Sequence, residues 1–172
     1  MATSTVIRAL DQLGGLLGAV TAEDLGRPTP CSAWTVADLS DHIVNSVAGM
    51  ATMALGGQPD WSAQTHHDDP ATALDRQGRA LVDALGVDDG AFPAGMAAAE
   101  LAVHAYDLAT ALGMPTAGLD REVAEVGRAF MTSSMTDDMR GTAFGPEQPA
   151  PADADAYERI AAFAGRSVRT PG

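Results

Sequence analysis

The sequence predicts an all-α protein, a bundle of five or six helices in a single domain over residues 1–172. Alanine is abundant and aromatic side chains make up only 5% of the chain, which favours helix over sheet. Apolar residues recur at three- and four-residue steps, the period of an amphipathic helix. The sequence contains no internal repeat and no linker-like segment, so we expect one helical domain.

The first helix is expected over residues 3–24, where one apolar stripe faces the core. This stripe consists of Val6, Leu10, Leu13, Leu17 and Val20. Three glycines, Gly14, Gly15 and Gly18, weaken the helix, because each costs up to about 1 kcal/mol relative to alanine. Gly26 and the prolines after it then break the chain.

The second helix has the clearest start. Thr35 is a good N-cap, and Asp38 places a carboxylate in the first turn. The apolar stripe that follows consists of Val36, Leu39, Ile43, Val47 and Met50. The helix is expected to run to about Leu55, because Gly56 and the glycine after it end the pattern.

The third helix is expected from about Pro70 to Leu85, with Asp69 as its cap and Gly86 closing it. The fourth is expected over residues 95–112 and reads MAAAELAVHAYDLATAL before a terminating glycine. A helix this apolar on all sides is typically central in its fold.

Two shorter helices complete the prediction, over residues 120–134 and 152–164. The segment 58–67 is polar and is expected to be a loop. The segment 137–151 is rich in glycine and proline and is expected to be irregular.

Polar residues inside the most apolar helix stand out. Glu100 and His104 are four residues apart, so they share one helix face, and Asp107 extends that face. A buried carboxylate or imidazole is costly unless it is paired or bound to a metal. The pattern therefore indicates either a buried polar pair or a metal site.

His42 is a second polar intruder, on the border of the apolar stripe of the second helix. Two antiparallel helices could bring His42 opposite Glu100 and His104, and two histidines with one carboxylate form a common set of ligands for a first-row metal. Zinc, nickel, iron(II) and cobalt all accept these donors. Asp38 and Asp107 are candidate acceptors for the far ring nitrogens of the histidines.

Other interpretations stay open from the residues alone. Glu100 and His104 could form a hydrogen-bonded pair without any ion. His66 and His67 belong to a polar loop, for which plain solvation competes with adventitious metal binding or a role at the mouth of the site. Cys31 has no base beside it in the sequence, so a plain loop thiol is favoured over a nucleophile.

The charge of the chain excludes some partners. The formal net charge is −13, with ten arginines and no lysine. We expect no binding to nucleic acid or to anionic membranes, because both require clustered positive charge. A single cysteine and the lack of a signal-like start or a long apolar run favour a cytoplasmic protein. No P-loop, GxGxxG or GxSxG motif is present.

Three segments resemble a known family. TPCSAWTVADLSDHIV (29–44) and AAELAVHAYDLATALG (98–113) are similar to the two signatures of the mycothiol-dependent maleylpyruvate isomerase N-terminal family, a group of DinB-like helical metalloproteins. The ending AFGPEQPAPADADAYERIAAFAGR (143–166) resembles a single-domain subgroup described as metal-binding. The likeness covers nearly the whole chain.

The resemblance implies a DinB-like four-helix bundle with one or two additional short helices. It also implies a divalent metal, typically zinc, held by residues that match His42, Glu100 and His104. Family isomerases carry a further C-terminal domain for which a chain ending at 172 leaves no room. The expected activity is therefore that of an S-transferase or isomerase-like enzyme that uses a thiol such as mycothiol or bacillithiol. The alternative is a non-catalytic metal or small-ligand binding protein of the same fold. Family habit suggests a homodimer.

Overall fold

The computed structural model describes residues 2–31, 34–62, 64–87, 92–136, 140 and 144–168. The helices are α1 (Ala2–Gly18), α2 (Val36–Ala54), α3 (Pro70–Val87), α4 (Ala94–Ala111), the short 3-10 helix η1 (Thr116–Gly118), α5 (Arg121–Ser134) and α6 (Ala156–Phe163). Within these ranges the strand-type pairing is limited to one isolated bridge between Pro28 and Thr35. The predicted all-α class is confirmed.

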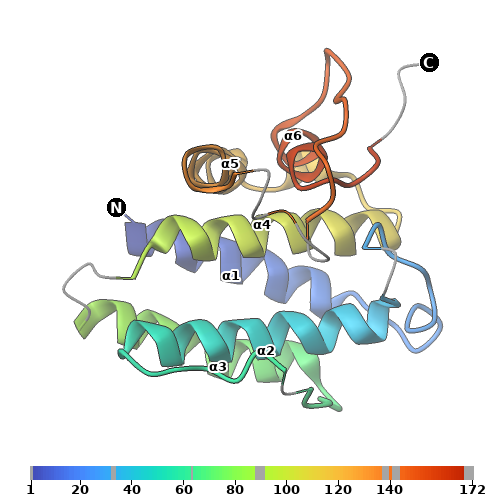
Figure 1. The fold of residues 1–172 in the computed structure, drawn as a ribbon. Coiled ribbons are helices and arrows are strands. Elements are labelled where there is room, and N and C mark those ends of the chain that lie inside the picture. The colour runs from blue at the N-terminus through green and yellow to red at the C-terminus, as the bar shows by residue number, and fades with distance from the viewer. Residues whose placement is uncertain are drawn as a thin grey trace.

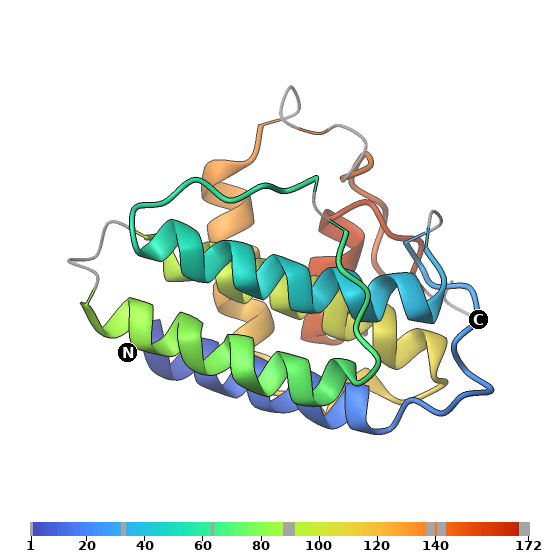
Figure 2. The ribbon, with the colours of Figure 1, turned by 90° about the horizontal axis from the view of Figure 1, so that it is seen from below.

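The first four helices run alongside one another and form a four-helix bundle (Figure 1). Helices α5 and α6 lie across the outer side of α4 and are seen end-on in Figure 1. Helix α4 therefore contacts α1, α2, α5 and α6, which confirms that the most apolar helix is central. Figure 2 shows the segment between α2 and α3 returning along α2.

Helices α2 and α4 run in opposite directions past each other (Figure 1). The start of α2 is fixed by a capping box: the Thr35 side chain accepts from the Asp38 N–H, and the Asp38 carboxylate accepts from the Thr35 N–H. These two bonds satisfy amides that have no partner inside the helix. The predicted cap is confirmed, and it sets the register in which His42 faces α4.

The first helix is shorter than predicted, because α1 ends at Gly18 and not at residue 24. Beyond it, the Asp24 carboxylate accepts hydrogen bonds from the Thr21 N–H at 2.9 Å and from the Thr21 hydroxyl at 2.7 Å. Side chains of this kind compete with the helix for backbone groups, and the three glycines of α1 leave little propensity to oppose them.

Two further boundaries differ from the prediction. Helix α3 continues through Gly86 to Val87, because Gly86 stays helical and does not adopt the left-handed conformation with which a glycine ends a helix. Helix α6 begins at Ala156, later than predicted, where Asp155 and Glu158 form a second capping box. The composition alone did not show which acidic residue would be the cap.

The described parts of the predicted loops, 58–67 and 137–151, contain no helix. Residues 63, 137–139 and 141–143 lie outside the described residues. Among the helices that the structure describes, none is both long enough and apolar enough to cross a membrane.

Candidate metal centre

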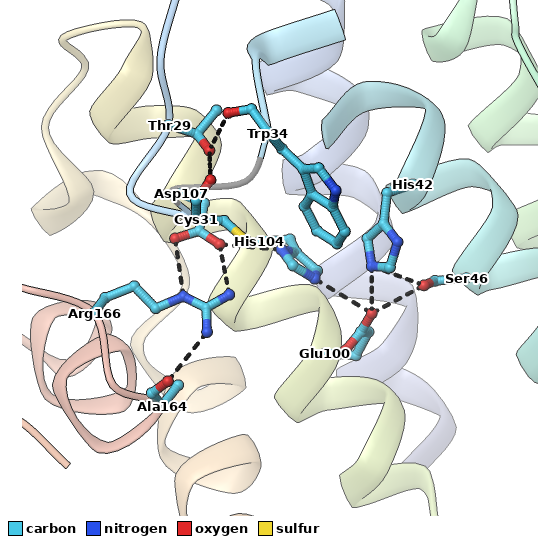
Figure 3. A network of polar contacts seen from close by, with 10 residues as sticks. All are labelled: Thr29, Cys31, Trp34, His42, Ser46, Glu100, His104, Asp107, Ala164 and Arg166. Carbon is cyan, nitrogen blue, oxygen red and sulfur yellow. Dashed lines mark hydrogen bonds and ion pairs between the residues drawn. The ribbon is translucent and has the colours of Figure 1, made fainter. Parts of the chain in front are cut away.

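The three side chains that the sequence singles out meet between α2 and α4 (Figure 3). His42 Nε2 lies 3.1 Å from Glu100 Oε1, and His104 Nε2 lies 3.3 Å from the same oxygen. One ligand atom from each residue falls within 4.8 Å of the other two. The antiparallel helix pair thus brings together residues that are distant in the sequence. That they bind a metal stays a prediction.

The cluster has a buried side and an accessible side. His104 is 4% exposed, whereas the side chains of His42 and Glu100 are each 25% exposed. His42 and Glu100 therefore form the side of the cluster nearer to solvent, while His104 is held inside the protein.

The charges of the cluster favour an ionised carboxylate. Burial raises the pKa of Glu100, but the charge of His104 and hydrogen bonds from His104 and His42 outweigh burial, so this pKa lies well below its ordinary value. Burial lowers the pKa of His104, yet Glu100 and Asp107 raise it to about 9. With a pKa of about 9, His104 is protonated at neutral pH and donates to the ionised Glu100 carboxylate, so an ion bound at these donors would displace the Nε2 proton.

Behind His104 lies a second carboxylate. Asp107 is fully buried, and its Oδ2 is 3.1 Å from His104 Nδ1. The side chain of Arg166 contacts the same carboxylate, with Nε 3.3 Å from Oδ1 and a terminal nitrogen 3.1 Å from Oδ2. The role predicted for Asp107, as acceptor for the far nitrogen of a histidine, fits this geometry. No pattern in the sequence pointed to Arg166, which follows α6.

Ser46 is another residue that the sequence analysis did not identify. Its hydroxyl donates to Glu100 Oε1 at 2.9 Å and lies 3.2 Å from His42 Nε2. Ser46 is one turn after His42 on α2, so the same helix face presents both groups to α4. A serine at helical spacing from a candidate ligand is the signal that could have indicated it.

Trp34 covers the imidazoles. Its ring centroid lies 4.2 Å from that of His42 and 5.9 Å from that of His104. The turn that carries it is held by Thr29, whose hydroxyl donates to the carbonyl oxygens of Cys31 and Trp34, each at 2.9 Å. Cys31 is partly buried in this turn. The Trp34 ring thus packs directly over the site.

The role predicted for Asp38 is wrong. Its carboxylate is exposed and accepts from the Thr35 N–H at 2.9 Å and the Thr35 hydroxyl at 2.6 Å. Both bonds use Oδ2 of Asp38, and the carboxylate caps α2 in place of facing His42, because an N-terminal amide of a helix needs an acceptor nearby.

His66 and His67 do not join the three-residue cluster. His66 Nδ1 lies 2.8 Å from an Asp41 carboxylate oxygen, and the His67 backbone N–H donates to the same side chain at 2.9 Å. His67 Nε2 is 3.1 Å from Asn45 Oδ1. The loop is therefore attached to α2, although the His66 side chain remains 75% exposed.

Comparison with known proteins gives the chain its family. Residues 6–86 match the mycothiol maleylpyruvate isomerase N-terminal domain, and this range includes His42 but not Glu100 and His104 of α4. Two proteins of Mycobacterium tuberculosis match over nearly the full length: uncharacterized protein MT0763 of strain CDC 1551 / Oshkosh and uncharacterized protein Rv0738 of strain ATCC 25618 / H37Rv. Each is 32% identical over 175 residues, covering 94% of this chain and 96% of the relative. No solved structure matches the chain.

The all-helical architecture agrees with these matches, because a helical bundle of the DinB-like type is what the structure contains in its described residues. The chain therefore belongs to the family of the mycothiol maleylpyruvate isomerase N-terminal domain.

Proposed function

We propose that the protein is a metal-dependent enzyme that joins a low-molecular-weight thiol of the mycothiol type to an electrophile, as an S-transferase or isomerase-like enzyme. The observation that supports this most is the convergence of two imidazole nitrogens and one carboxylate oxygen within 4.8 Å of one another. This donor set suits a divalent first-row ion, zinc above all, with nickel or iron as alternatives.

The side chains present fit such an ion. His42 and His104 direct Nε2 at a shared point beside Glu100. Asp107 accepts at the far nitrogen of His104, so Nε2 can coordinate once the ion has displaced its proton. Three protein ligands leave a position for a substrate atom, as in catalytic zinc sites. The exposed edge formed by His42 and Glu100 gives that atom a route in.

A divalent ion at these donors would favour the deprotonated form of a thiol bound at the open position. In the reaction the thiolate sulfur supplies the electron pair of a new carbon–sulfur bond. The displaced pair leaves with the leaving group or moves into a conjugated system, and the thiol proton passes to solvent. Trp34 covers the imidazole rings, while Ser46 and Asp107 hold Glu100 and His104 in position.

The proposal also implies which partners the protein binds and in which compartment it works. A thiol cosubstrate must stay reduced, so we place the protein in the cytoplasm. Its partners are a small thiol and a small electrophile. We expect neither nucleic acid nor anionic membranes as partners, because both require clustered positive charge and the net charge is −13. A homodimer stays a prediction.

The test is a conjugation assay with mycothiol or bacillithiol and a panel of electrophiles, run on zinc-loaded protein. We expect thiol-dependent product formation that His104→Ala abolishes. The matched control is His66→Ala, because His66 is an exposed histidine outside the cluster. Saturable thiol binding without turnover on any electrophile would instead identify a non-catalytic binding protein of the same fold.

A further inference from the structure

Arg166 is a buried arginine that the proposed reaction does not use directly. Its side chain is 6% exposed, and it forms a two-point contact with Asp107, which has no exposed surface. A third donor of the same guanidinium bonds the Ala164 carbonyl oxygen at 3.1 Å. Figure 3 shows the guanidinium lying along the Asp107 carboxylate, on the side of α4 that faces the C-terminal segment.

Stability alone is a weak reason for this arrangement. Removing two charges from water costs free energy that their attraction often only balances, and apolar side chains of similar size are frequently as stable. Stability therefore does not explain the Arg166–Asp107 ion pair, whereas the contact between Asp107 and His104 indicates a second role for it. The Asp107 oxygen that Arg166 contacts at 3.1 Å is also the oxygen 3.1 Å from His104 Nδ1.

The geometry of a guanidinium explains what this contact does. Its planar donors bind a carboxylate at two points, so they fix the orientation of the carboxylate as well as its position. A fixed Asp107 accepts the Nδ1–H of His104, which selects the tautomer whose Nε2 carries a lone pair. That nitrogen is the atom aimed at Glu100 and at the proposed ion.

We propose that Arg166 is a positioning residue of the metal centre, acting through Asp107 on His104. The proposal rests on the proposed metal site. It assigns a function to the segment after α6, which thereby supports a centre built from α2 and α4. The partners of a histidine ligand outside the metal's own coordination affect metal affinity strongly, and their loss typically costs about 10–100-fold.

The test compares cobalt(II) binding by wild type, Arg166→Gln and Arg166→Lys, using the visible absorption of the bound ion and competition with a chelator. We expect Arg166→Gln to raise Kd about 10–100-fold and to change the absorption spectrum. Arg166→Lys keeps the charge without the two-point contact, so its Kd should lie between the two. Circular dichroism confirms that each variant is folded.

The matched control is Arg140→Gln. Arg140 donates to the carbonyl oxygens of Gly145 and Phe163, so this substitution loosens the same C-terminal segment without touching Asp107. Its cobalt affinity and spectrum should match wild type. If Arg166→Gln does not fold, Arg166→Lys decides the question.

Two failures are distinguishable. Wild-type protein that binds no cobalt would overturn the proposed function. Wild-type protein that binds cobalt, with Arg166→Lys and any folded Arg166→Gln binding equally well and with the same spectrum, would overturn only the role of Arg166. An equal loss of affinity in Arg140→Gln would also overturn it, because general loosening of the segment would then be sufficient.

Discussion

Glu100 Oε1 is the point on which the polar groups of the centre converge. His42, His104 and Ser46 each direct a polar atom at this oxygen, at 3.1, 3.3 and 2.9 Å. Helical spacing predicted that Glu100 and His104 lie next to each other, because residues four apart share one face of a helix. Spacing alone did not assign Ser46 to the site, because a serine within a helix can also bond its own backbone, as Ser40 does.

The first residue-scale prediction concerns this serine. Ser46→Ala removes a donor that orients Glu100, and we expect zinc affinity to fall about tenfold. Ser40→Ala is the matched control, because Ser40 is buried in the same helix but its hydroxyl bonds the Val36 carbonyl oxygen. Isothermal titration with zinc measures both variants. Equal affinities for the two would show that Ser46 does not support the site.

A second prediction concerns the loop that docks on α2. The His66 imidazole donates a hydrogen bond to Asp41, and this bond and the charge of the carboxylate raise the pKa of His66 above 6.5. Because the folded pKa is raised, the contribution of this contact to stability is full below the unfolded pKa of 6.5 and is lost as pH rises through the folded value.

An NMR titration of the imidazole protons checks this prediction. Asp41→Asn should return the pKa of His66 toward 6.5, because it removes the largest cause of the shift. Asp68→Asn should lower it much less, because Asp68 lies 3.7 Å away and contributes least. An unchanged pKa in Asp41→Asn would contradict the observed contact.

At the level of elements, local signals predicted most of the fold. Thr35 with Asp38 marked the start of α2, and the apolar run of α4 marked the central helix. The predicted helix boundaries were wrong where side chains compete with the helix for backbone hydrogen bonds, as after the end of α1. The pairing of His42 with α4 required a tertiary contact, which spacing within one helix cannot specify. Only the family resemblance predicted that the three candidate ligands, His42, Glu100 and His104, belong to one site.

The packing of α5 against α4 gives an element-scale prediction. A Cβ on Gly127 would lie 2.8 Å from Ala99 Cα, which is backbone and cannot move aside. Gly127→Ala should therefore destabilise the protein by about 1–3 kcal/mol, the usual cost of overpacking. Urea denaturation measures the change in the free energy of unfolding.

The control for this prediction is Gly15→Ala. Gly15 lies within α1 and a Cβ there would meet nothing within 4 Å. Alanine at this position should stabilise the protein by about 0.5–1 kcal/mol, because glycine loses more conformational freedom in a helix. If Gly127→Ala left stability unchanged, or raised it as Gly15→Ala is expected to do, the result would contradict the close approach of α4 and α5.

At the level of the whole molecule, the candidate metal centre lies between α2 and α4, two helices that already pack within the bundle. The three candidate ligands come from α2 and α4, which also contact their neighbours through the apolar core. Metal binding should therefore add stability to a folded protein without being required for folding. This differs from small zinc domains, in which the ion supplies most of the folding free energy.

Metal removal tests this view. At free zinc 100 times Kd, binding adds about 2.7 kcal/mol, and a domain of this size gains roughly 2–4 °C in Tm per kcal/mol. A chelator should therefore lower Tm by several degrees and leave the far-ultraviolet circular dichroism at room temperature unchanged. His104→Ala should show no metal-dependent Tm. Loss of helical signal on chelation would contradict the prediction.

The most direct test of the central claim is the metal content of protein purified without a histidine tag, measured by inductively coupled plasma mass spectrometry. His42, Glu100 and His104 should hold one divalent ion per chain in wild type and none in His104→Ala. The exposed histidine variant His66→Ala should keep its ion. Wild-type protein without a stoichiometric ion, or His104→Ala that retains one, would contradict the assignment of the three residues as a metal centre.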